Sequence, residues 1–257
     1  MKNFISKNKN ALVTAGAVVF WILVWHVISL AIDQQLLVPS PVSVAAALFG
    51  MLGAAFFYLA LGNTLLHIAL GFFIAFVSGV ALSLPALKFK AVKRLLQPLM
   101  TVINSTPVAS FIILALLFVG SKHIATLTSF LMVMPIIYTN TLTGMESIDR
   151  AQFEAADVFG MTRGERLRYI FLPETMPHIL SGSSVGLGIS WKAGVAAEVI
   201  GITANSLGGR LYDSKVLIDI PSVFAYTVAI IVISFAFEKL FMAAVKLAAR
   251  LLVENGQ

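Results

Sequence analysis

The chain has 257 residues, of which 59% are hydrophobic and only 12% charged, and its formal net charge is +6. Soluble domains carry roughly 25% charged residues, so this composition excludes a soluble globular protein. Apolar runs recur that are long enough to cross a hydrocarbon core of roughly 30 Å. Cysteine is absent, which excludes a disulfide framework and a thiolate metal site. We therefore expect an all-α polytopic membrane protein with one transmembrane domain over residues 1–257.

The N-terminal segment has the layout of a signal peptide, with Lys2, Lys7 and Lys9 ahead of an apolar run. That run, residues 11–32, is too long for a signal peptide, and Ile32-Asp33-Gln34 is a poor cleavage site. We interpret it as an uncleaved first span.

Six segments are expected to span the membrane. They cover residues 11–32, 64–87, 98–119, 124–145, 177–200 and 222–248. With a cytoplasmic N-terminus, most lysines and arginines fall on the inner side, and the outer segments hold only Lys122, Arg210 and Lys215. Because basic residues are retained in cytoplasmic loops during insertion, both termini are predicted to be cytoplasmic. An odd number of spans would break this alternation.

The connection after the first span begins with Leu37-Val38-Pro39-Ser40-Pro41. Ser40 suits a helix N-cap and Pro41 the first helical position. The uncharged residues 42–58 could form a seventh span, but the basic residues 88–94 would then lie outside. We therefore predict a helix packed on the outer face.

The fifth expected span is rich in small residues. They are Gly182, Gly186, Gly188 and Gly194 with Ser181, Ser183, Ser184 and Ser190. Small residues let helix backbones approach closely in lipid. Tight packing is the simpler interpretation, and the lining of a pathway is the alternative.

The longest charged stretch, residues 146–173, is predicted to form two short cytoplasmic helices. The first covers residues 152–159, with Phe153, Ala156 and Phe159 available for an apolar stripe, and Gly160 ends it.

The second helix should begin at Thr162, which has the capping-box spacing to Glu165. It should stop before Pro173, because the residue before a proline disfavours the α conformation. Its arginines would also suit a loop resting on lipid headgroups. Glu154, Asp157 and Glu165 argue against that alternative, because an anionic surface repels them. The residues alone leave both interpretations open.

The same stretch resembles the EAA signature of ABC importer permeases. The resemblance rests on Glu154-Ala155-Ala156, on Gly160 six residues after Glu154, and on Ile170-Phe171-Leu172-Pro173. Residues 37–41 are similar to the entry of nitrate/sulfonate/taurine-type permeases. Ser190-Trp191 and residues 196–201 are similar to the fifth span of that subgroup.

The resemblance implies a type I importer fold in the bacterial inner membrane. The chain would work as a homodimer with two ATPase subunits and an extracytoplasmic binding protein. Residues 150–172 would be the coupling helices that sit in a cleft of the ATPase. The coupling residues would be Glu154, Ala155, Ala156, Gly160, Arg163, Leu172 and Pro173.

The sequence contains no phosphate-binding loop. Gly120-Ser121-Lys122 lacks the required order of a Gly-x-x-x-x-Gly-Lys-Ser/Thr motif. We therefore expect no enzymatic activity and no cofactor in this chain, with ATP and Mg bound by the partner ATPase. No metal site and no nucleic-acid partner are expected.

Lys192 is an unusual residue for the centre of a span. A lysine there costs about 2.5–3.5 kcal/mol on insertion scales, so it should face a partner or a wet cavity. Glu198 is six positions away and does not share its helix face, whereas Trp191 and Glu198 do share one. Lys192 either pairs with a carboxylate elsewhere or contacts an anionic substrate. We treat Trp191, Lys192 and Glu198 as candidate pathway residues.

The third expected span contains Asn104-Ser105-Thr106-Pro107. Proline frees a carbonyl one turn back, and nearby polar side chains either bond that backbone or line a cavity. Asn104 and Thr106 are therefore further pathway candidates. His26 and His67 are expected to be hydrogen-bonded structural residues.

Two rival functions remain at this stage. The first is the coupling subunit of an energy-coupling-factor vitamin transporter, which would be expected to show short Ala-Arg motifs. The second is an intramembrane enzyme, which would need paired ionisable or nucleophilic groups within the spans. Lys192 and Glu198 alone are weak support for such a site. The favoured function is a permease for a small, anionic solute, such as a sulfonate, nitrate, taurine or a vitamin precursor.

Overall fold

The computed structural model describes the backbone of residues 2–32, 34 and 36–254, and side chains within residues 13–245. All regular structure in these residues is helical. The elements are α1 (Lys2–Ile32), α2 (Pro41–Leu52), α3 (Ala55–Lys88), α4 (Lys90–Ser105), α5 (Val108–Val119), η1 (Ser121–His123), α6 (Ile124–Glu146), α7 (Arg150–Val158), α8 (Arg163–Arg166), the π-helical turn η2 (Leu167–Phe171), α9 (Leu172–Ile200), α10 (Leu207–Val216) and α11 (Ile220–Glu254).

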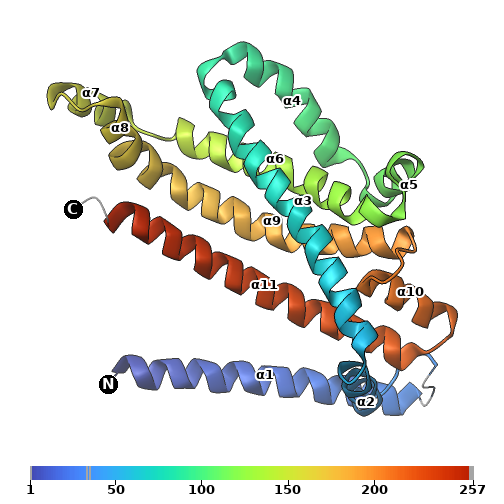
Figure 1. The fold of residues 1–257 in the computed structure, drawn as a ribbon. Helices are drawn as coiled ribbons and strands as arrows, with labels where there is room; N and C mark the ends of the chain where they lie inside the picture. Colours follow the sequence, from blue (N-terminus) through green and yellow to red (C-terminus); the bar gives the residue numbers. More distant parts are fainter. Residues whose placement is uncertain (1, 33, 35, 255–257) are drawn as a thin grey trace.

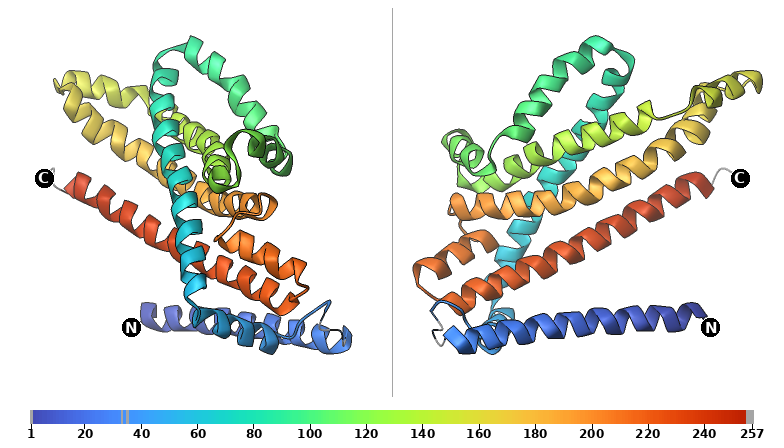
Figure 2. Two further views of the ribbon diagram at one scale, coloured as in Figure 1. Left: turned by 45° about the vertical axis from the view of Figure 1, so that its right-hand side comes forward. Right: turned by 180° about the vertical axis from the view of Figure 1, so that it is seen from behind.

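The axes of four long helices, α1, α6, α9 and α11, are roughly aligned, with α1 and α9 antiparallel to α6 and α11, and α3 crosses them (Figures 1 and 2). Both ends of the chain lie at the end of the bundle that carries α7 and α8 (Figure 1). The short helices α2, α5 and α10 gather at the opposite end. The two ends of the bundle therefore carry different structural elements.

Helices α3, α6 and α9 form the centre of the bundle, around a core that includes Phe72, Ile137 and Leu187. Glycines permit the close approach of these helices. A Cβ atom on Gly71 would lie 2.4 Å from the carbonyl oxygen of Thr126, and one on Gly194 would lie 2.6 Å from Ile68. The packing interpretation of the fifth-span glycines thus holds for Gly194, and also for Gly182 and Gly186, whereas Gly188 faces open space.

We predict that Gly71→Ala destabilises the protein and that Gly62→Ala, in the same helix, does not. The added methyl group of the first variant meets backbone across the α3–α6 contact, whereas nothing lies within 4 Å at Gly62. Overpacking of this kind costs about 1–3 kcal/mol. The check is thermal unfolding of both variants in detergent, and equal melting temperatures would contradict it.

The region around α2 confirms part of the expectation for residues 37–58. Ser40 caps α2 by accepting a hydrogen bond from the amide of Ser43, and Pro41 is the first helical residue. The predicted helix over 42–58 is wrong beyond Leu52, because a break at Gly53 and Ala54 separates α2 from α3. The second expected span is accordingly part of a longer helix that starts at Ala55.

The third expected span, residues 98–119, is not one continuous helix. Helices α4 and α5 meet at an angle of 105°. Thr106, with ψ of 126°, adopts the extended conformation that a following proline favours. The hydroxyl of Thr106 donates to the carbonyl of Val102 at 2.6 Å, the same carbonyl that accepts from the amide of Thr106 at 3.0 Å.

By length and apolar composition, four helical segments of the described chain could each cross a membrane. They are Val13–Ile32, Ala55–Lys88, Ser121–Glu146 and Ile220–Val245, and the bent pair of α4 and α5 would be a fifth. Helix α9 is 29 residues long but is less apolar, because it contains serines, glycines and the charged residues Lys192 and Glu198. It lies inside the bundle between α3, α6 and α11 (Figures 1 and 2).

Candidate functional site

A helical hairpin, residues 149–171, projects from one end of the bundle (Figure 1). Asp149 caps α7 by accepting from the amide of Ala151. Gly160 has a φ of +67°, the left-handed conformation that glycine adopts without a steric cost. The expected turn at Gly160 is thus present.

The predicted capping box at the start of the second helix is confirmed. The amide of Glu165 donates to the hydroxyl of Thr162, and the Glu165 carboxylate accepts from the amide and hydroxyl of Thr162. These hydrogen bonds favour the charged form and lower the pKa of Glu165. Helix α8 therefore starts at a residue that can be identified from the sequence.

Side chains inside the hairpin hold its two arms together. Ile148, Ala156 and Ile170 are buried against each other, and the rings of Phe153 and Phe171 lie 5.5 Å apart. On the outside, Arg166 pairs with Asp157. The hairpin is a packed unit, and Phe153 and Ala156 form the expected apolar stripe.

The second arm does not end before Pro173, contrary to the sequence-based prediction. The chain continues through η2 into α9, and Phe171 keeps a helical conformation. The amide of Leu172 bonds to the carbonyl of Leu167, five residues back, so the helix is widened just ahead of the proline. This widened turn accommodates a residue that lacks an amide proton. The hairpin is consequently joined to α9 without a flexible linker.

The tip of the hairpin exposes two large apolar side chains. Val158 is 83% exposed and Phe159 is 82% exposed, next to the turn at Gly160. Phe159 is thus not part of the buried stripe, where the sequence analysis had placed it. Val158 and Phe159 thus form a small exposed apolar surface at the tip of a polar element.

The predicted coupling residues are distributed over both sides of this hairpin. Glu154, Ala155, Arg163 and Pro173 are exposed, Leu172 is half-buried and Ala156 is buried. Ala156 therefore supports the hairpin from within. The exposed residues Glu154, Ala155 and Arg163 lie on the surface of the hairpin, and Pro173 lies in the first turn of α9. Sequence reasoning missed Val158, although a valine among the polar residues of α7 was a usable signal.

The structure separates the two charged residues predicted in the fifth span. Lys192 is exposed, and within the part of the chain with described side chains it makes no ion pair. Glu198 is only 1% exposed. No carboxylate among the described side chains is thus a partner for Lys192.

Glu198 is bound by neutral donors from two other helices. Its Oε2 atom accepts from the hydroxyl of Thr64 in α3 at 2.9 Å and from the amide of Gly208 in α10 at 3.0 Å. Thr64 in turn accepts from the amide of Leu207. The amide groups at the start of a helix carry partial positive charge, which stabilises a carboxylate placed there. Glu198 therefore ties the end of α9 to α3 and α10.

Trp191 also lies inside the bundle. It is 3% exposed, and its ring lies 6.0 Å from that of Phe237 in α11. The predicted pathway set is thereby divided: Lys192 reaches an open face, whereas Trp191 and Glu198 are packed between helices.

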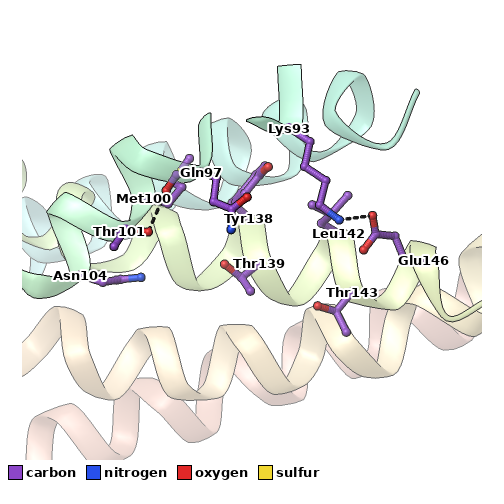
Figure 3. A pocket seen from close by; sticks show the side chains of 10 residues that line it. All are labelled: Lys93, Gln97, Met100, Thr101, Asn104, Tyr138, Thr139, Leu142, Thr143 and Glu146. Atoms are coloured by element: carbon purple, nitrogen blue, oxygen red, sulfur yellow. Dashed lines mark hydrogen bonds and ion pairs between the residues drawn. The ribbon is translucent and has the colours of Figure 1, made fainter. Parts of the chain in front are cut away.

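A cavity of about 250 Å³ lies between α4 and α6. Its lining residues are Lys93, Gln97, Met100, Thr101, Asn104, Tyr138, Thr139, Leu142, Thr143 and Glu146. Lys93 and Glu146 point toward each other and form an ion pair, and Asn104 lies at the opposite end of the cavity (Figure 3). Of the third-span candidates, Asn104 is thus a lining residue, whereas Thr106 bonds the backbone.

The two histidines differ. His67 bonds the carbonyl of Asn63 at 2.8 Å, as expected. The Nδ1 atom of His26 is buried without a hydrogen bond in the described part of the chain, so the expectation is wrong there. Within the described residues no group of three or more His, Asp or Glu side chains could hold a metal ion.

These features define a class of protein: a helical membrane component with a packed helical hairpin at one end and a polar cavity between two of its helices. A family model described as "Binding-protein-dependent transport system inner membrane component" matches residues 79–250, and the chain belongs to this family.

Several relatives are permeases. The taurine transport system permease protein TauC of Escherichia coli (strain K12) is 26% identical over 220 residues, which cover 83% of this chain and 80% of the relative. The putative aliphatic sulfonates transport permease protein SsuC of Bacillus subtilis (strain 168) is 26% identical over 216 residues, 79% of this chain and 74% of the relative. The nitrate import permease protein NrtB of Leptolyngbya laminosa is 30% identical over 141 residues, 53% and 50% of the two chains.

A crystal structure of an amino acid ABC transporter has a similar fold. The TM-score is 0.52 at 21% sequence identity, over 75% of this chain and 93% of that chain. Its membership of the binding-protein-dependent family makes the present chain a permease component in the inner membrane. It is not itself catalytic, it works with a binding protein and an ATPase, and the ATPase binds ATP.

Proposed function

We propose that this chain forms the translocation pathway of an ATP-driven importer for a small, anionic solute. In this proposal it has six spans, with α4 and α5 as the third and α9 as the fifth. Two copies assemble with two ATPase subunits, and residues 149–171 dock on the ATPase.

The orientation follows from the distribution of charge between the two ends of the bundle. The hairpin carries Arg150, Arg163, Arg166 and Arg168. The end of α3 and the start of α4 carry Lys88, Lys90, Lys93 and Arg94. Both chain ends lie at the hairpin end (Figure 1). Because basic residues are retained on the cytoplasmic side, we assign this end to the cytoplasm.

The observation that carries the docking proposal is the tip of the hairpin. A headgroup-bound helix would present a continuous apolar face along its length. Here the exposed apolar residues of α7 and its following turn, Val158 and Phe159, stand beside the acidic Glu154 and Asp157. An apolar tip with charged flanks suits insertion into a protein cleft. The continuous connection through η2 would transmit a movement of the hairpin directly to α9.

The substrate class is proposed from the relatives and from Lys192. Taurine, aliphatic sulfonates and nitrate appear in the names of three relatives, and each of these solutes carries an oxyanion group. Lys192 is an exposed cation on a helix of the bundle centre. A formylaminopyrimidine permease among the relatives keeps a vitamin precursor as the second candidate. The binding-protein-dependent family favours this importer over an energy-coupling-factor subunit.

The experiment is uptake into proteoliposomes that contain the chain with its ATPase and binding protein. We expect ATP-dependent accumulation of a radiolabelled sulfonate or nitrate, and a loss of at least tenfold for Lys192→Met if Lys192 contacts the solute. Radiolabelled choline is the cationic control. Accumulation of choline without any anion uptake would contradict the proposed substrate class.

A further inference from the structure

A second cavity, of about 300 Å³, lies at the end of the bundle opposite the hairpin. It is formed by α3, by η1 and by the loop between α9 and α10. Its lining residues are Asn63, His67, Ser121, Lys122, Thr203, Ala204, Asn205 and Ser206. Seven of these eight residues are polar, which is unusual for a cavity at the surface of so apolar a chain.

Long-range hydrogen bonds fix the walls of this cavity. The side-chain amide of Asn63 donates to the carbonyl of Asn205 at 2.9 Å, and the hydroxyl of Thr203 donates to the carbonyl of Ser121 at 3.0 Å. The loop also contains Ile202 and Asn205 with positive φ angles of 48° and 54°. Non-glycine residues keep such conformations only where the surrounding structure holds them. The walls of the cavity are therefore held in place by hydrogen bonds and by the backbone conformation of the loop.

The charge of the cavity is positive. Lys122 lies in its wall, and within the part of the chain with described side chains this lysine makes no ion pair. No carboxylate is among the lining residues. Glu198 lies behind the wall, but its carboxylate is engaged by Thr64 and Gly208. The cavity between α4 and α6 differs, because Glu146 neutralises its lysine.

Hydrogen-bond donors are also available. Across the described backbone, the amide groups of Ala204 and Asn205 donate no hydrogen bond to another protein group. The hydroxyl of Ser121 makes none either among the described side chains. Oxyanions are bound by ammonium groups together with backbone amides and hydroxyls.

We propose that this cavity is a binding site for a small oxyanion, a sulfonate, nitrate or carboxylate, at the outer mouth of the permease. Lys122 supplies the charge, and the Ala204–Asn205 backbone and Ser121 supply the donors. The assignment to the outer mouth rests on the proposed function. The site would receive the solute when the binding protein releases it.

The test uses the absence of cysteine from the natural chain. In the complete transporter in lipid nanodiscs, A204C is treated with anionic and with cationic methanethiosulfonate reagents, and the two rates are compared. L217C, on an exposed residue at the same end of the molecule, is the matched control. The anionic reagent should be favoured at position 204 relative to position 217. Lys122→Gln should lower the preference for the anionic reagent at position 204 by about fivefold. The ratio of the two labelling rates at position 217 should not change.

A second measurement identifies the ligand class. Millimolar methanesulfonate or nitrate should slow the labelling of A204C, and tetramethylammonium should not. If Lys122→Gln leaves the rate ratio unchanged, the positive site is wrong. If the ratio of labelling rates depends on Lys122 but neither anion slows the labelling of A204C, the cavity does not bind the solute. The positive charge would then contact the binding protein. These readouts do not involve the hairpin, so failure here is distinguishable from failure of the ATPase-docking proposal.

Discussion

The double variant Val158→Ala/Phe159→Ala is expected to lose at least tenfold in ATP-driven uptake while its helices stay folded. Both side chains are more than four-fifths exposed, so their removal costs the permease itself little. In the proposed complex they are the buried anchors of the ATPase contact. Loss of a central apolar anchor costs about 2 kcal/mol or more at a protein interface. The measurement is solute uptake together with the rate of ATP hydrolysis.

A matched control exists at the other end of the molecule. Val216 and Leu217 are also adjacent and exposed, at 60% and 77%. Val216→Ala/Leu217→Ala should leave the ATPase attached during purification, whereas the hairpin variant should lose it. Equal loss in both variants would point to a general effect on the complex and would contradict a docking role for the tip.

Replacing Glu198 by alanine is expected to destabilise strongly the end of the bundle opposite the hairpin. The hydroxyl of Thr64 and the amide of Gly208 would lose their acceptor in a buried place. Each buried unsatisfied donor costs about 1–3 kcal/mol, so the sum is roughly 3 kcal/mol. For a chain of this size that corresponds to a melting temperature lowered by roughly 10 °C.

The Glu198→Gln variant tests whether this hydrogen-bond network needs the negative charge of Glu198 or only the shape of its side chain. The glutamine keeps one carbonyl oxygen for the donors, so a smaller loss is expected than with alanine. Glu154→Ala, at an exposed position, should leave the melting temperature unchanged. An unchanged melting temperature for Glu198→Ala would show that Thr64 and Gly208 find other partners, and the anchoring role would be wrong.

Local signals in the sequence predicted local structure well. The Thr162–Glu165 capping box and the Ser40–Pro41 helix start are both present, because each depends on residues within one turn. The turn expected at Gly160 is present for the same reason, and Gly160 adopts a left-handed conformation there. The family was also accessible from the residues, since the EAA-like string lies within a short segment.

Features that depend on distant residues were not predictable in this way. The partner of Glu198 is Thr64, 134 residues away, and no periodicity connects the two. The continuation of the helix through Pro173 requires the π-helical turn, which has no sequence signature of its own. The 105° bend at Thr106–Pro107 did have a local signal, which is the proline. Because this proline lies inside an apolar run, the sequence favoured one continuous helix there.

In the proposed complex, the tip of the hairpin lies in a cleft of the ATPase. The most direct measurement is cross-linking of F159C, in this cysteine-free chain, to the ATPase with a short thiol-to-amine reagent in native membranes. We predict a cross-linked product of the permease and the ATPase whose yield changes on addition of ATP, and none from L217C. Labelling of F159C by a lipid-soluble reagent, with no product to the ATPase, would place the tip in the headgroups and contradict the claim.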